Sequence, residues 1–401
     1  MRLPFFLLLP ACGATVVPLA LSDAAPDTSV RVRADDVDPP DVIVDCGGSG
    51  DFDTISAAIS AADDGDLIHV LPCTYRESID FLGKALRIVA TEGPEDTVVD
   101  ARNGAVVRAV NGEGTGTSLE GFTLTGGGDS AEAAVYVDFA SLRLEDIVLD
   151  GNGGWATIYG ASADIELAGV TFTDNRPSYG ISIYMSRGGL VATELALDCG
   201  SATVGVYLGH GSGMIDRSDI SCRGGNATQW EHAVGHVQRS TLLGNVAIVH
   251  EDDHYDDFVN LTNTLVDGAV SVTYGSATVR NSIVTGGITF TTVYLSTTVE
   301  GSVIEGGYCG ITADTTDFTV RNTLFWDNTA NACGLLPDPV GTNDNLQEDP
   351  LFVDPGAGDW TLGSGSPGVD AGPDASGYAD VDGSRNDIGV YGGPFSIGGG
   401  W

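Results

Sequence analysis

Four tyrosines recur along the chain at near-constant intervals, and their spacing marks them as candidate ligand-binding residues. Each lies between aliphatic neighbours, as in the run Val135-Tyr136-Val137. Side chains alternate between the two faces of a β-strand, so aliphatic residues directed into a core place these tyrosines on the outer face. The four residues are Tyr136, Tyr159, Tyr184 and Tyr207.

A row of outward rings has two interpretations. Flanked by small residues, it forms a shallow groove whose rings stack on sugar faces. Alternatively, the rings stack on one another and stiffen the sheet. The sequence leaves both open. The first interpretation assigns substrate binding to the four tyrosines together with Asp138 and His232, and its small flanking residues are Ala134, Thr157, Ser182 and Gly205 on one side and Ala161, Ser186 and Gly209 on the other.

Groups able to move protons or neutralise charge lie beside this row. Arg187 and His210 each follow a tyrosine of the row by three residues, and His232 occupies the same place in the next repeat. Eliminative cleavage of a glycan needs a base and a group that neutralises developing charge. His210 and Arg187 are therefore the candidate catalytic residues if the protein has an activity.

Metal binding has weaker support. The histidine pairs spaced by three residues, His232 with His236 and His250 with His254, would share one face of a helix but not of a strand, so zinc is not favoured. Oxygen-rich loops suit calcium, although solvated carboxylates are the alternative. We expect no required cofactor, with calcium as an optional ligand. Its candidate ligands are Glu251, Asp252, Asp253, Asp256 and Asp257, with a second acidic loop at Asp380, Asp382 and Asp387.

The charge of the chain excludes several classes of protein. It holds 56 acidic and 17 basic residues, a net charge of −39, which opposes binding to nucleic acids or anionic membranes through bulk charge. No apolar run reaches the roughly 18 residues that a membrane span requires. Hydrophobic residues make up 42% of the chain, which is enough for a large core.

The first residues predict export. A short apolar run follows Met1 and Arg2, and Leu9-Pro-Ala-Cys12 resembles a bacterial lipobox, in which Cys12 carries the lipid. The alternative is an ordinary signal peptide cleaved near residues 20–25. If Cys12 carries the lipid, residues 1–11 are a lipoprotein-type signal and residues 12–41 are a flexible acidic tether. We expect a cell-surface or outer-membrane lipoprotein, or a secreted protein.

Six further cysteines follow at nearest-neighbour gaps of 27, 23 and 24 residues. An even set in an exported protein indicates disulfides, and the similar gaps favour sequential pairing among the fifteen possible connectivities. Buried free thiols are the alternative. The predicted pairs are Cys46 with Cys73, Cys199 with Cys222, and Cys309 with Cys333.

A repeat of about 22 residues organises the chain and gives these spacings their meaning. Leu119-Glu-Gly-Phe-Thr-Leu-Thr-Gly and Val279-Arg-Asn-Ser-Ile-Val-Thr-Gly are two of ten copies. Short β-branched strands ending in turn residues, with no helical period between them, predict the coils of a parallel β-solenoid. Cys199 and Cys222 each lie five residues after the third residue of a copy. The third residues are 121, 146, 169, 194, 217, 239, 263, 281, 301 and 322.

The start and end of the repeat region carry a resemblance. An amphipathic helix is predicted at 51–62, followed by Thr74-Tyr-Arg-Glu77 and Gly83-Lys84. This stretch resembles the N-terminal cap of right-handed parallel β-helix proteins of the pectin-lyase-like superfamily. Asp349-Pro-Leu-Phe352 and Ser366-Pro-Gly-Val-Asp-Ala-Gly372 resemble the ends of bacterial surface proteins of this type. The resemblance implies one all-β right-handed solenoid at 42–335, with a C-terminal capping segment and tail at 336–401.

The same resemblance allows catalytic motifs to be sought. Of the polygalacturonase-type motifs only Gly209-His-Gly211 is found, and the pectin methylesterase and epimerase motifs are missing from the sequence. The alginate-lyase pair of lysine and arginine is also missing, because the one lysine, Lys84, lies in the predicted cap. We therefore expect a lipid-anchored protein that binds extracellular polysaccharide without cleaving it.

Two alternatives remain from the sequence. One is a polysaccharide lyase or glycoside hydrolase of the pectate-lyase-like type, and the other is a structural spacer or adhesin. The expected partner is an extracellular glycan. We expect contact with the membrane only through the lipid anchor, no nucleic acid, and a monomer.

Overall fold

The computed structural model describes residues 39–128, 133–249, 258–293, 297–394 and 396. The predicted lipidation site and one predicted calcium loop lie outside these ranges, namely Cys12 and the residues Glu251, Asp252, Asp253, Asp256 and Asp257. Within the described ranges, no helix is long and apolar enough to cross a membrane.

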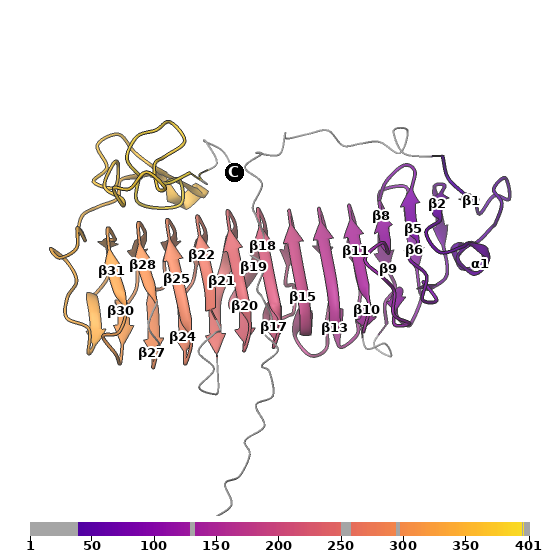
Figure 1. The fold of residues 1–401 in the computed structure, drawn as a ribbon, viewed down its shortest axis with the longest axis horizontal. Helices are drawn as coiled ribbons and strands as arrows, with labels where there is room; N and C mark the ends of the chain where they lie inside the picture. The colour runs from indigo at the N-terminus through magenta and orange to yellow at the C-terminus, as the bar shows by residue number, and fades with distance from the viewer. Residues whose placement is uncertain (1–38, 129–132, 250–257, 294–296, 395, 397–401) are drawn as a thin grey trace, which may run out of the picture. The chain divides into compact units, whose positions relative to one another are not determined.

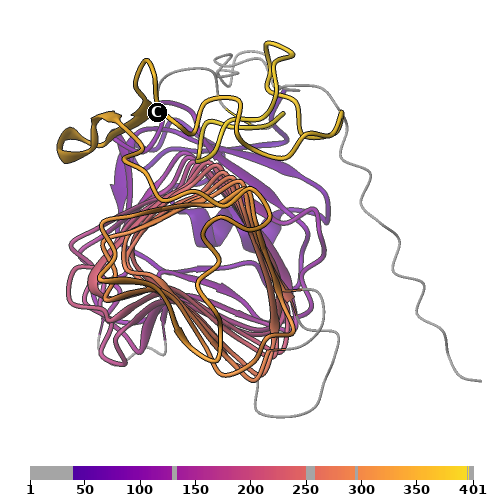
Figure 2. The ribbon, with the colours of Figure 1, turned by 90° about the vertical axis from the view of Figure 1, so that its left-hand side faces the viewer.

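Successive coils pair in parallel along three faces, so the predicted right-handed parallel β-helix is confirmed (Figure 1). The stack has about 12 turns, more than the ten copies in the sequence, because β1–β7 add coils before residue 119. Seen along the stack, the later coils superimpose (Figure 2).

The first face, here the tyrosine face, carries the ladder described below. Its strands are β4 (Ile79–Asp80), β7 (Val107–Ala109), β10 (Ala133–Asp138), the first part of β13 (Ala156–Ala168) and of β15 (Ile181–Thr193), β17 (Val204–Gly209), the last part of β19 (Asp219–Glu231) and of β21 (Thr241–Val249), β24 (Val270–Thr273), β27 (Ile288–Thr291), β30 (Cys309–Ala313) and β33 (Ala330–Gly334).

The second face, here the arginine face, follows it in each coil. Its strands are β1 (Val42–Val44), β2 (Leu67–Val70), β5 (Arg87–Ala90), β8 (Ser118–Glu120), β11 (Ser141–Glu145), the last parts of β13 and β15, β18 (Ser212–Asp216), β20 (Val234–Gln238), β22 (Phe258–Thr262), β25 (Ser276–Arg280), β28 (Thr298–Glu300) and β31 (Thr319–Arg321).

The third face completes the coil. Its strands are β3 (Cys73–Tyr75), β6 (Thr97–Asp100), β9 (Thr123–Thr125), β12 (Val148–Asp150), β14 (Thr171–Thr173), β16 (Ala196–Asp198), the first parts of β19 and β21, β23 (Leu265–Asp267), β26 (Ile283–Val284), β29 (Val303–Glu305) and β32 (Leu324–Trp326).

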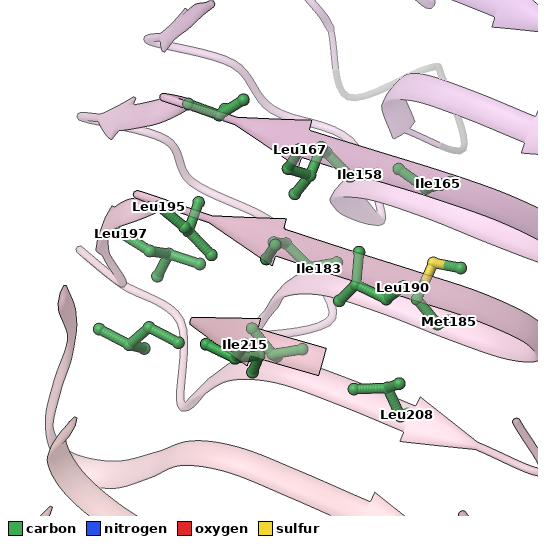
Figure 3. Packing of buried hydrophobic residues seen from close by; sticks show 14 of the residues in the cluster. Ile158, Ile165, Leu167, Ile183, Met185, Leu190, Leu195, Leu197, Leu208 and Ile215 are labelled. Carbon is green, nitrogen blue, oxygen red and sulfur yellow. The ribbon is translucent and has the colours of Figure 1, made fainter. Parts of the chain in front are cut away.

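The core consists of aliphatic side chains stacked in register. Ile158 pairs with Ile183, and Leu167 pairs with Ala192, which pairs in turn with Ile215. Figure 3 shows such residues one above another in successive coils. Since parallel strands lie about 4.8 Å apart, like side chains pack directly on like side chains from coil to coil.

The corner between the arginine face and the third face explains the repeat. All ten third residues of the copies have positive φ, from Gly121 at 80° to Asn322 at 48°. Glycine, asparagine and aspartate tolerate this left-handed conformation, which makes them common at this place in the repeat. The recurrence that defined the repeat in the sequence is therefore a column of left-handed turns.

The predicted cap helix is α1 (Ile55–Ala61), with Thr54 as its N-cap. The carboxylate of Glu77 accepts hydrogen bonds from the free N–H groups of Ile55 and Ser56 at 2.9 and 2.8 Å. At the other end, Nζ of Lys84 donates to the carbonyl oxygens of residues 59, 60 and 62. Both helix ends are thus satisfied by side chains of later coils.

The three predicted disulfides are confirmed. The Cα–Cα distances are 6.5 Å for Cys46–Cys73, 5.1 Å for Cys199–Cys222 and 5.9 Å for Cys309–Cys333. Each bond joins parts of the chain 23–27 residues apart, about one coil, so each fastens one turn of the solenoid to the next.

Past the last coil, the chain folds back along the side of the solenoid. It forms a hairpin of β34 (Phe352–Asp354) and β35 (Asp359–Leu362), joined by a 3₁₀ turn at Pro355–Ala357. Ile388 and Val390 pack on outward apolar residues of the third face, Ile283, Val303 and Leu324. Figure 1 shows this segment, in yellow, along one side of the later coils.

Asparagines of the corner column hold this C-terminal segment. Nδ2 of Asn263 donates to the carbonyl oxygens of Val390 and Gly392 at 2.8 and 2.7 Å. Nδ2 of Asn322 donates to those of Ala371 and Gly372 at 3.0 and 3.3 Å. An asparagine here thus supplies both the left-handed backbone and the donor that binds the segment.

Replacing Asn263 by glycine removes this amide but keeps a residue suited to positive φ. We expect Asn263→Gly to lower the free energy of unfolding by about 1–3 kcal/mol, because the carbonyl oxygens of Val390 and Gly392 lose their hydrogen-bond donor. Urea denaturation measures the change. Asp146→Gly, at the equivalent corner of an upstream coil, should leave stability equal or slightly higher. Similar losses in both variants would contradict the role of the amide.

Candidate functional site

The four tyrosines form a stacked ladder across β10, β13, β15 and β17. Tyr136 pairs in register with Tyr159, Tyr159 with Tyr184, and Tyr184 with Tyr207. Their ring centroids are 5.0, 5.4 and 4.8 Å apart, with interplanar angles of 5–7°. Each inner ring is therefore covered on both faces by its neighbours. The half-buried rings present their edges and hydroxyl groups outward, not their faces.

Charged side chains lie at both ends of the ladder. The guanidinium of Arg108 lies 5.2 Å from the ring centroid of Tyr136. At the other end, the Tyr207 hydroxyl donates to Oε2 of Glu231 at 2.7 Å. Burial raises the pKa of Tyr207, and so does this hydrogen bond to a carboxylate. Tyr207 therefore stays protonated, and Glu231 is fixed beside it as an acceptor.

Two further aromatic residues, here the aromatic shelf, lie in the turns that precede β13 and β15. The rings of Trp155 and Tyr179 stack with centroids 4.3 Å apart. Trp155 also packs edgewise on Tyr184 at 4.7 Å and on Tyr159 at 5.6 Å. Tyr179 is 59% exposed. The shelf is thus an exposed ring supported from behind by the ladder.

Sequence reasoning missed the shelf and Glu231. Trp155 directly precedes a strand and Tyr179 lies two residues before one, so the two aromatic residues come just ahead of the same strand position in adjacent coils. This shared position was the signal in the sequence that could have indicated contact between the two rings. Glu231 pairs in register with Gly209 of the preceding coil, which brings it beside Tyr207.

The small residues expected beside the tyrosines do not border a groove. Ala134, Thr157, Ser182 and Gly205 are buried, because the strands are irregular there and parallel pairing skips each of them. Period-two alternation fails at this point and turns their side chains inward. On the other side of the ladder, Asp138, Ala161 and Ser186 are partly exposed, and Gly209 is buried.

The candidate acid–base residues form a column at the corner between the tyrosine and arginine faces. Arg187, His210 and His232 have φ of 60°, 54° and 50°. The imidazoles of His210 and His232 stack with centroids 4.8 Å apart. Arg187 and His210 are exposed, and the N–H of His210 donates to the carbonyl oxygen of Glu231. The structure therefore brings the histidines together beside the end of the ladder.

The second acidic loop uses its carboxylates within the chain. Asp380 accepts hydrogen bonds from the N–H groups of Asp387 and Gly393, and Asp382 from that of Ser384. Among the residues that the structure describes, no group of three or more histidines, cysteines and acids is arranged to hold a metal ion.

Several solved structures are similar to this chain, at low sequence identity and low TM-score. The family PL6 alginate lyase AlyGC has a TM-score of 0.41 at 13% identity, over 74% of this chain and 52% of the lyase, so the chain spans about half of that enzyme. For the carrot pectin methylesterase the values are 0.29 and 14%, over 78% and 89%. For the Azotobacter vinelandii mannuronan C-5 epimerase AlgE6 A-module they are 0.36 and 13%, over 74% and 94%.

That the chain is a parallel β-helix follows from the parallel pairing of its own coils. No protein-family model matches the sequence, and no curated protein matches it. At these identities and TM-scores the likeness carries no argument, so function has to be argued from the side chains of this chain.

A partly buried carboxyl group, that of Glu305, lies apart from the ladder. Glu305 lines a cavity of about 330 Å³ on the third face, together with Trp326, Asp327 and Asp349. Burial raises the pKa of Glu305 to about 7, and repulsion from Asp327 and Asp349 adds to this. Asp349 belongs to the C-terminal segment, so ionised Glu305 repels the segment that covers it.

We expect the Tyr184 ring to contribute to stability through its stacked neighbours. Tyr184→Ala removes stacking on Tyr159 and Tyr207 and should lower the free energy of unfolding by about 1–3 kcal/mol, at 0.5–1.5 kcal/mol per pair. Tyr184→Phe keeps the ring and should change it by less than about 0.5 kcal/mol. Chemical denaturation compares the two, and equal stability of the alanine variant and the wild type would contradict the stacking.

The raised pKa of Glu305 predicts a pH-dependent cost. The folded state favours the protonated form, so this preference stabilises the fold at low pH and is lost as pH rises through about 7. Glu305→Gln should therefore raise the melting temperature by a few degrees at pH 8.5 and leave it unchanged at pH 4. Glu348→Gln removes an exposed carboxylate instead. If it raised the melting temperature equally, general repulsion in this acidic chain would explain the effect.

Proposed function

We propose that the protein binds an extracellular polysaccharide at the aromatic shelf and the adjoining edge of the tyrosine ladder, and that it does not cleave the chain. The observation that carries this proposal is the Tyr179 ring, which is 59% exposed and stacked at 4.3 Å on Trp155. The exposed part of this ring is where the apolar face of a sugar ring would stack.

The ladder adds polar contacts at a regular spacing. Its ring centroids repeat every 4.8–5.4 Å along the coils, close to the length of one sugar residue. The Tyr207 hydroxyl already donates to Glu231, and its oxygen can still accept a hydrogen bond from a sugar hydroxyl. Asp138 and Glu231 lie at the margin as acceptors, so a glycan lying along the coil axis would meet like groups at like intervals.

A rigid binding site favours the binding of a flexible polysaccharide. Trp155 contacts Tyr159, Tyr179 and Tyr184, and the N–H of Tyr179 donates to the carbonyl oxygen of Trp155 at 3.1 Å. The shelf is therefore ordered before a glycan arrives. Pre-organised aromatic residues lose little conformational entropy on binding, which compensates for a small contact area.

Net charge narrows the class of glycan. A chain of net charge −39 repels polyanions at long range, so a neutral polysaccharide is the better partner. The three disulfides support export, because such bonds persist in oxidising compartments. A lipid at Cys12 would hold the solenoid at the cell surface, where many weak contacts with one polymer add through multivalency.

Tyr179→Ala tests the shelf. Loss of one stacking contact worth about 0.5–1.5 kcal/mol should weaken retention about 3–10-fold in affinity electrophoresis through neutral polysaccharide gels. Tyr308→Ala is the matched control, since Tyr308 is 81% exposed and directly precedes β30, on the same face but several coils away from the shelf. Retention that falls equally in both variants, or in neither, would contradict binding at the shelf.

A further inference from the structure

We propose a second saccharide site, a cavity that the C-terminal segment completes against the third face, which takes one or two residues of a neutral glycan. The cavity has a volume of about 510 Å³, within the range of ligand sites. It lies on a different face from the aromatic shelf, and its occupation does not depend on the proposed function.

The floor of the cavity comes from two adjacent coils. Thr241 and Leu243 of β21 pair in register with Leu265 and Asp267 of β23, and all four line the cavity. Outward leucines on a solenoid strand need cover. Further along this face the C-terminal segment supplies it, packing on Ile283, Val303 and Leu324. Over Leu243 it leaves a space instead, and Leu265, which packs at the edge of this cluster, borders that space.

The opposite wall is aromatic and fixed in place. Trp360 and Tyr391 line the cavity, and Trp360 packs edgewise on Phe352 at 5.1 Å. The neighbouring turn is closed by a hydrogen bond from the N–H of Ala357 to the carboxylate of Asp354. Val390, directly before Tyr391, accepts the hydrogen bond from Asn263. An apolar, aromatic wall held this way suits the C–H face of a sugar ring.

The polar groups at this cavity balance in charge. Arg223 lies 3.7 Å from Asp267, and the other oxygen of Asp267 accepts a hydrogen bond from Thr285 at 2.9 Å. One guanidinium and one carboxylate can bind the hydroxyls of a ligand as donor and acceptor without favouring a charge on it. Together with the net charge of −39, this pair selects a neutral ligand over an anionic one.

The test is calorimetric titration of the full chain with maltose, cellobiose and N,N′-diacetylchitobiose, with digalacturonic acid as the anionic probe. At least one neutral disaccharide should bind with a stoichiometry of one at this cavity. Leu243→Trp fills the cavity from the solenoid side and should weaken that binding at least tenfold. Leu335→Trp adds the same ring at an exposed position and should leave it unchanged.

Two further variants keep the proposal falsifiable if Leu243→Trp does not fold. Asp267→Asn keeps the shape and should weaken binding several-fold. Tyr179→Ala should leave disaccharide binding intact, which separates this site from the aromatic shelf. The proposal is overturned if no neutral disaccharide binds, if digalacturonic acid binds instead, or if binding persists in both the Leu243→Trp and Asp267→Asn variants.

Discussion

Each coil of the solenoid pairs in parallel with the coils on either side, so a position in one coil lies over the same position in the next. This register turns a sequence repeat into columns of identical environment. A tyrosine at one position becomes a stacked ladder, two cysteines become a disulfide, and an asparagine at the corner becomes part of a row of donors. A slip of one residue would send the inward set outward and dismantle all three.

The same constraint decides what the ladder can bind. Rings spaced by the coil rise stack on one another, which stiffens the face but covers the ring faces that a sugar would need. Exposed aromatic surface therefore has to come from the turns, where the chain leaves the strict register. Tyr179 is such a residue, and the ladder beneath Trp155 holds it in place. The ladder is thus a rigid support, and its hydroxyl edge adds polar contacts.

Sequence reasoning succeeded where the register alone determines the outcome. The parallel β-helix and the pairing of Cys199 with Cys222 follow from position within the repeat, and the cap helix follows from its own amphipathic pattern. It failed where a local irregularity reversed the direction of a side chain, as at Thr157 and Ser182. Strict alternation does not predict a residue that the strand pairing skips. Contacts between segments more than 100 residues apart, such as that of Asn263 with Val390, leave no periodic trace in the sequence.

The central claim is that the solenoid binds a neutral glycan and does not cleave it. Incubation of the intact protein with neutral polysaccharides, followed by affinity electrophoresis and light-scattering measurement of polymer length on the same samples, tests it most directly. The account predicts retarded migration in at least one polysaccharide with no change in polymer length. Shortened polymer would show an enzyme, and unretarded migration in every neutral polysaccharide would show that the shelf binds no glycan.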